Sequence, residues 1–199
     1  MRLMYNTDMR KGVSGFTIVE LLIVVVVIAI LAAITIVSYN GIQTKATNTS
    51  IISTASNVQR MIASYIASTG EYPYAVDASY VCVTTTTTCL RNSVTPIPGK
   101  NTFDNSMATI GTVPRSAPLV SSVRGGITYQ YSTARTVNGT VQPAIMSYYI
   151  LGINSDCGLP VLDREDATAA VRSSNKYTVG NVGSSGVTQC VVSIEGPSA

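Results

Sequence analysis

The chain has 199 residues, of which 46% are hydrophobic and 12% are charged, and its formal net charge is +3. So small a charge, without a cluster of Lys and Arg, argues against a dedicated nucleic-acid surface. The chain contains no histidine. It also shows no GxSxG turn, no phosphate-binding glycine loop and no CxxC pair, so we predict no catalytic residues, no metal site and no cofactor.

The N-terminal segment 16–37 is apolar apart from Glu20 and a few hydroxyl side chains. As a helix it would be about 33 Å long, which is enough to cross the roughly 30 Å hydrocarbon layer of a membrane. The run 24–28 is β-branched and a poor helix former, but a lone strand in lipid would leave its backbone groups unpaired, so we predict a helix. Three basic residues precede it and none follows before Lys45, which places the N-terminus in the cytoplasm.

Three simpler interpretations fit this segment less well. A buried core strand would be much shorter. A secretory signal would have a shorter apolar part, followed by a cleavage site with small residues two positions apart, which is missing here. A plain membrane anchor explains the length and the basic flank but not the carboxylate, which is costly in lipid and is usually retained for a role. We therefore expect a positive charge to meet Glu20.

The segment GFTIVELLIVVVVIAILAAI, after a short basic leader, resembles the N-terminal signature of type IV pilins and pseudopilins. The resemblance implies that a prepilin peptidase cuts after Gly15 and methylates the new amino terminus on Phe16. It also implies that Glu20, fifth in the mature chain, pairs with the amino terminus of a neighbouring subunit. The leader departs from the family, in which a basic residue commonly stands directly before the cleaved glycine, because Lys11 precedes Gly12 and not Gly15. A cut after Gly12, however, would not place Glu20 fifth in the mature chain.

The resemblance further implies how the chain is organised and what it does. Residues 1–15 would be the leader, 16–69 one helix (16–37 in the membrane or filament core, 38–69 amphipathic), and 70–199 the head, with an αβ-loop, an antiparallel sheet and a disulfide-bounded C-terminal region. We expect a pilus subunit that passes from the inner membrane to a surface filament used in adhesion, motility or DNA uptake. Its partners would be further copies, minor pilins, the peptidase, the membrane platform, the assembly ATPase and, before assembly, lipid.

Two alternatives remain open for the function. A pseudopilin of a secretion or DNA-uptake system shares every N-terminal feature, although the length and the C-terminal cysteines favour a pilin modestly. A monomeric surface-binding protein held by a signal anchor would make Glu20 incidental.

Removal of the leader lowers the formal charge from +3 to +1, because three basic residues and one acidic residue leave with it.

The segment 38–69 carries apolar residues at steps of three and four, the period of an amphipathic helix that packs one stripe against a domain. We expect the helix to end at Thr69, because Gly70 suits a left-handed cap and Pro73 cannot continue it. Asn40 and Gly41 interrupt it. They mark either a tolerated close contact or a point where the helix melts in a filament, and the sequence does not decide between the two.

Four cysteines lie in the part expected outside the cytoplasm, where disulfides persist. Three connectivities are possible. We favour Cys82 with Cys89, which closes a short loop, and Cys157 with Cys190, which closes a long one.

The predicted fold class is α+β, with the long N-terminal helix packed on a roughly four-stranded antiparallel sheet. Residues 71–125 read as an irregular connection rich in Ser, Thr, Pro and Gly. Segments 127–136 and 141–152 read as a hairpin around Asn138-Gly139, and 187–195 as a further strand.

Two smaller features remain. The acidic run 163–166 and the alanines after it suggest a short helix, with a calcium loop as the weaker alternative. Asn48 and Asn138 each begin an Asn-x-Ser/Thr tripeptide, the glycan acceptor pattern, but it is common by chance.

Overall fold

The structure is a computed structural model of the chain. It describes residues 15–84, 88–91, 96–115, 119–121, 124–162, 168–169 and 186–197. Most of the predicted leader and the acidic run 163–166 lie outside these ranges. The chain divides into two units, residues 1–43 and 44–199, and the boundary falls inside the long helix α1 (Ile18–Thr69).

Helix α1 has 52 residues and ends where the sequence predicts. Gly70 follows it with a φ of 71° and donates its N–H to the carbonyl of Ile66 at 2.8 Å, which is the expected left-handed cap. The start differs by two residues from the predicted one, because Thr17 caps the helix from outside it. The β-branched run is helical, as the argument from backbone hydrogen bonds in lipid requires.

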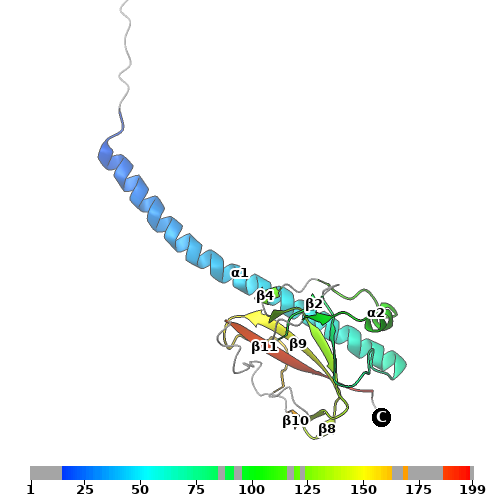
Figure 1. The fold of residues 1–199 in the computed structure, drawn as a ribbon. Helices are drawn as coiled ribbons and strands as arrows, with labels where there is room; N and C mark the ends of the chain where they lie inside the picture. The colour runs from blue at the N-terminus through cyan, green and yellow to red at the C-terminus, as the bar shows by residue number, and fades with distance from the viewer. Residues whose placement is uncertain are drawn as a thin grey trace, which may run out of the picture. The chain divides into compact units, whose positions relative to one another are not determined.

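The main sheet has four antiparallel strands in the order β1-β6-β9-β11. Two of them, β9 and β11, are labelled side by side in Figure 1. They are β1 (Ser79–Cys82), β6 (Thr128–Tyr131), β9 (Ala144–Leu151) and β11 (Val187–Ile194). In the register, Met146 of β9 lies between Tyr129 of β6 and Val192 of β11. The predicted α+β class, with a long helix against a four-stranded antiparallel sheet, is confirmed.

The core lies between one face of this sheet and the second half of α1. The helix contributes a stripe at steps of three and four: Ile51, Ala55, Val58, Ile62 and Ile66. Alternate residues of the strands meet it, because successive strand side chains point to opposite faces; these are Val81, Tyr129, Met146, Tyr148, Ile150, Cys190, Val192 and Ile194. This packing fixes residues 51–66 of the helix on the head.

The other face of the sheet is also buried but carries polar side chains. The guanidinium of Arg135 donates to Oε1 of Gln130 at 2.7 Å, and that of Arg124 donates to the carbonyl of Arg91 at 2.6 Å. Arg124 also lies over the ring of Tyr149 at 5.4 Å. Because such groups need partners once they leave water, the loops over this face are held to the strands by specific bonds.

The interpretation of residues 71–125 as an irregular connection was wrong in one respect. The segment contains β1, an edge strand of the main sheet, as well as the helix α2 (Asn101–Ala108). Its described residues also form four short strands: β2 (Thr88–Cys89), β3 (Ile97–Pro98), β4 (Leu119–Ser121) and β5 (Arg124–Gly125). Elements this short show too few periods to stand out in a sequence.

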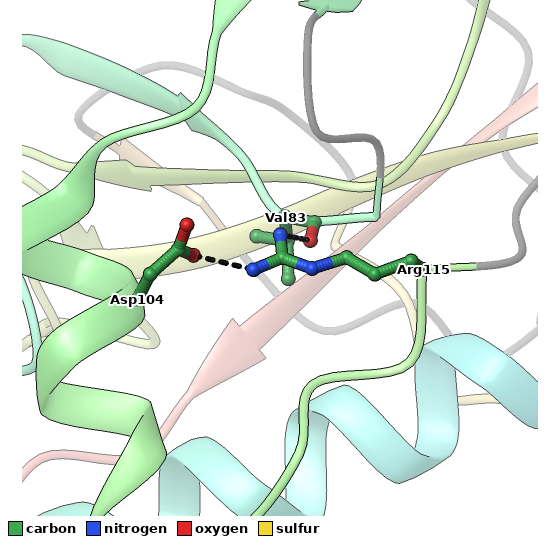
Figure 2. A network of polar contacts seen from close by, with 3 residues as sticks. All are labelled: Val83, Asp104 and Arg115. Atoms are coloured by element: carbon green, nitrogen blue, oxygen red, sulfur yellow. Dashed lines mark hydrogen bonds and ion pairs between the residues drawn. The ribbon is translucent and has the colours of Figure 1, made fainter.

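An ion pair holds α2 and the loop after it to the end of β1. Arg115 Nη2 lies 2.9 Å from Oδ1 of Asp104 on α2, and its Nη1 donates to the carbonyl of Val83 at 2.6 Å (Figure 2). Phe103 of α2 packs on Tyr129, with ring centroids 5.3 Å apart. The short helix therefore completes the core on the same face of the sheet as α1.

The predicted hairpin is confirmed at its turn and corrected along its arms. Asn138 and Gly139 have φ angles of 49° and 78°, and the strands β7 (Thr136–Val137) and β8 (Thr140–Val141) pair across them. Each predicted strand is nevertheless broken, into β6 with β7 and β8 with β9. Pro143 has no N–H to donate, and its carbonyl accepts the N–H of Ser132 at 2.8 Å where the arms separate.

The remaining short strand, β10 (Thr168–Ala169), pairs in parallel with β7. Because these two residues belong to the alanine-rich stretch that was expected to be helical, that prediction was wrong for them. Strand β11 ends at Ile194, one residue before the predicted end.

Candidate assembly site

The first part of α1 exposes apolar side chains around its whole circumference. From Phe16, just before the helix, to Ile36, the large apolar side chains have exposed fractions between 48%, at Val26, and 83%, at Ile18. A helix that is hydrophobic on all sides belongs in lipid or among other helices rather than on a water-facing domain. Its length and composition suffice to cross a membrane, and none of its most apolar stretch is buried within the chain.

The carboxylate of Glu20 closes a capping box with Thr17. Its Oε2 accepts the backbone N–H of Thr17 at 2.9 Å and the hydroxyl at 2.7 Å, while the N–H of Glu20 donates to Oγ1 of Thr17 at 3.2 Å. Two backbone donors at the helix start are thereby satisfied reciprocally. Both bonds to the carboxylate use the same oxygen, and no bond to Oε1 is formed within the described part of the chain. The second oxygen thus stays open to a partner from another molecule.

A family model described as the prokaryotic N-terminal methylation motif matches residues 10–36. The chain carries the methylation motif typical of type IV pilin-like proteins. The matched stretch contains Gly15, Phe16, Glu20 and most of the apolar run. Searches among curated proteins and among solved structures found no match.

This motif implies processing by a prepilin peptidase and assembly into pilus-like filaments in general. Pilin-like proteins, in which this motif is typical, are generally structural and not enzymes. The helix that can span a membrane, together with the motif, is consistent with an inner-membrane precursor and a later surface filament.

The expected cleavage position lies outside the helix. Gly15 and Phe16 precede the first turn of α1, both are exposed, and a Cβ added at Gly15 would meet no atom of the described residues within 4 Å. An exposed, non-helical peptide bond is the kind of site that a peptidase can enter. The predicted cleavage residue Gly15 and the predicted assembly residues Phe16 and Glu20 thus lie within the first turn of α1 or just before it.

Asn40 and Gly41 lie in an uninterrupted part of α1. Both are exposed, and a Cβ at Gly41 would meet no atom within 4 Å. Within the described residues, no close approach at Gly41 requires a glycine. The two interpretations that the sequence left open, a close contact with another helix or a point of melting in a filament, therefore both stay predictions.

Two disulfides join the same cysteines as the favoured pairs. Cys82 is bonded to Cys89, and Cys157 to Cys190, with sequence separations of 7 and 33. All four side chains are fully buried. The second bond links β11 to the loop after β9, where the hydroxyl of Tyr148 also donates to the carbonyl of Cys157 at 2.6 Å. Burial raises the pKa of the Tyr148 phenol, which keeps it a hydrogen-bond donor.

The structure distinguishes the two Asn-x-Ser/Thr tripeptides. The side-chain amide of Asn48 is engaged by the backbone of Leu151, with its Nδ2 donating to the carbonyl and its Oδ1 accepting the N–H, both at 2.8 Å. Asn138 is exposed in the β7–β8 turn. Asn48 therefore has a structural role that leaves no free amide for a glycan.

The head also has an open hollow between α1 and the β7–β8 turn, lined by residues that include Arg60, Asn138 and Glu195. Its lining mixes apolar and polar side chains. Among the described residues, no group of three or more Cys, Asp or Glu side chains could hold a metal ion.

Sequence reasoning missed two residues of this arrangement. Thr17 could have been found, because Thr-x-x-Glu before an apolar run is the sequence signature of a capping box. The role of Asn48 had no signal in the sequence, since its hydrogen-bond partner Leu151 is 103 residues away.

Proposed function

We propose that this chain is a structural subunit of a type IV pilus. It polymerises through the apolar half of α1 after cleavage behind Gly15 and methylation of the new amino terminus at Phe16. Glu20 pairs with that terminus on a neighbouring copy. The head, with its two disulfides, forms the outside of the filament.

The observation that carries this proposal is the all-round apolar exposure of residues 16–36 with one capped carboxylate at their start. Lipid or the same segment of other copies can cover such a helix, and only the second option gives Glu20 a positively charged partner. Because an unpaired charge in a low-dielectric core is strongly unfavourable, the pair would fix the axial register of each added subunit.

The transfer from membrane to filament exchanges lipid contacts for helix contacts. Lipid tails are about as apolar as leucine side chains, so burial of apolar surface contributes little to this step. Extraction of each subunit therefore needs work from outside the chain, for which the pilus system uses a cytoplasmic ATPase that acts through a membrane platform.

The test replaces Glu20 in two ways and compares it with an exposed carboxylate of the head. Glu20→Gln retains the capping box, because Gln also fits this position, and removes only the charge. Glu20→Ala removes both, and Glu71→Gln is the matched control outside the apolar segment. We expect both Glu20 variants to be inserted and folded but to yield no filaments in electron micrographs, while Glu71→Gln assembles normally.

Filaments from Glu20→Gln in normal number would contradict the charge pairing and favour another assembly rule, whereas a wild-type chain that is displayed but forms no filaments would indicate a signal-anchored monomer. Mass spectrometry of the mature chain should show a methylated N-terminus at Phe16, and any other start would refute the proposed processing. Long surface fibres that disappear when the gene is deleted support the pilus. Their absence, together with a defect in secretion or DNA uptake, would indicate a pseudopilin.

A further inference from the structure

The stretch of α1 just before its packed half combines poor helix formers with exposed side chains. Residues 39–47 include Asn40, Gly41 and two threonines, all poor helix formers. The side chains of residues 39–43 are exposed, so this first part of the stretch rests on its own backbone hydrogen bonds, whereas Thr44 and Thr47 are half-buried. The boundary between the two units of the chain falls here, after Gln43.

Asn48 ends this weakly held stretch with a two-point clamp. Its amide makes the two bonds to Leu151 that a neighbouring strand would make, one to the N–H and one to the carbonyl. Leu151 is the last residue of β9, beyond the point where β6 pairs with that strand. The side chain of Asn48 thus fixes one helical residue to the sheet backbone.

Leu151, to which Asn48 is bonded, is itself held in place by neighbouring residues. The carbonyl of Leu151 also accepts the hydroxyl of Ser155 at 2.9 Å, and the Ser155 N–H donates to Oγ1 of Thr188 on β11 at 2.9 Å. The disulfide between Cys157 and Cys190 closes the same loop. The clamp therefore leads into the covalently bounded part of the head.

Direct packing of α1 on the head begins within one turn of the clamp. Ile51 is buried, and Ile52 lies so close to Gly158 that a Cβ there would be 2.7 Å from its Cγ2. From Asn48 onward the helix is bound to the sheet, whereas for residues 39–43 it is exposed.

We propose that the Asn48–Leu151 clamp is the point at which any extension of α1 during assembly stops. The extensible stretch is then residues 39–47, and the head moves as a body that begins at Asn48. The part of this inference that concerns assembly rests on the proposed pilus function. The part that concerns the clamp holds for the chain on its own.

Hydrogen exchange with mass spectrometry on the full-length chain, in detergent micelles and in filaments, tests this device. An amide of α1 reports the bond to the carbonyl four residues earlier. With the backbone fixed from Asn48 onward, amides from Ile52 to Ile66 should exchange slowly, and those of residues 40–47 much faster in filaments. In Asn48→Ala, the amides of residues 52–54 should exchange about tenfold faster, because the next buried anchor is Ile51.

The neighbouring exposed residue supplies the control. Thr49→Ala should leave the exchange rates of amides 52–54 unchanged. Asn48→Asp keeps the acceptor for the Leu151 N–H but loses the donor, so it should raise these exchange rates by less than Asn48→Ala does. This second variant decides the question if Asn48→Ala does not fold.

Unchanged exchange at residues 52–54 in Asn48→Ala, or slow exchange at residues 40–47 in wild-type filaments, would overturn the inference. Two failures remain distinguishable. If filaments form but the boundary of protection does not move in Asn48→Ala, the clamp proposal alone is refuted. If the chain is never processed or assembled, the pilus proposal is refuted, while the micelle measurement still decides the role of the clamp.

Discussion

The two disulfides should differ in their contribution to stability, and the structure permits a matched comparison. Both pairs are fully buried, so replacing either pair by alanine removes two buried sulfur atoms. The loops they close differ, with sequence separations of 33 for Cys157–Cys190 and 7 for Cys82–Cys89. In the chain-entropy model the longer loop stabilises the folded state by about 3.7 kcal/mol and the shorter by about 2.4 kcal/mol at 25 °C.

The comparison of the two double variants isolates the effect of loop length. Cys157→Ala with Cys190→Ala should be less stable than Cys82→Ala with Cys89→Ala by about 1.4 kcal/mol. For a chain of this size that difference corresponds to about 3 to 6 °C in melting temperature. Thermal unfolding followed by circular dichroism in detergent, with the thiol content checked, measures it. Equal melting temperatures, or a lower one for the short-loop variant, would refute the reasoning.

Two further predictions concern the backbone and the pH. Gly158→Ala should destabilise the head by about 2 kcal/mol or more, because the position has a φ of 69° and the new Cβ would meet Ile52. The control Gly139→Ala, where φ is 78° but no described atom lies within 4 Å of the new Cβ, should destabilise it less. Equal unfolding midpoints in urea for the two variants would contradict this prediction. The Thr133 N–H, which donates to Asp77 at 2.7 Å, is the main cause that lowers the pKa of that carboxyl. Its stabilisation is therefore present above the ordinary carboxyl pKa and is lost as the pH falls through the lower folded value. The stability difference between wild type and Asp77→Asn should shrink below about pH 4, and a difference that stays constant from pH 7 to pH 3 would contradict the prediction.

The hairpin and the connection before it show where sequence reasoning reached its limit. The turn at Asn138-Gly139 was predictable because few residues accept two successive positive φ angles. The break beside it was not, since it depends on Pro143 accepting a bond from Ser132 on the other arm. Strand β1 was also not predictable, because its four residues show too little periodicity. It is a strand through its pairing with β6.

Local sequence patterns are enough to predict the apolar helix, its cap at Gly70, the placement of Glu20 and the stripe of residues 51–66 that faces the head. Each of these follows from local chemistry, namely hydropathy over a fixed length, backbone conformation and helical period. The folded chain was needed to see the strand order β1-β6-β9-β11, the buried arginines over the sheet face that points away from α1, and the clamp at Asn48. These depend on pairs far apart in the chain, and the energy of such a pair exists only once the chain has brought both partners together.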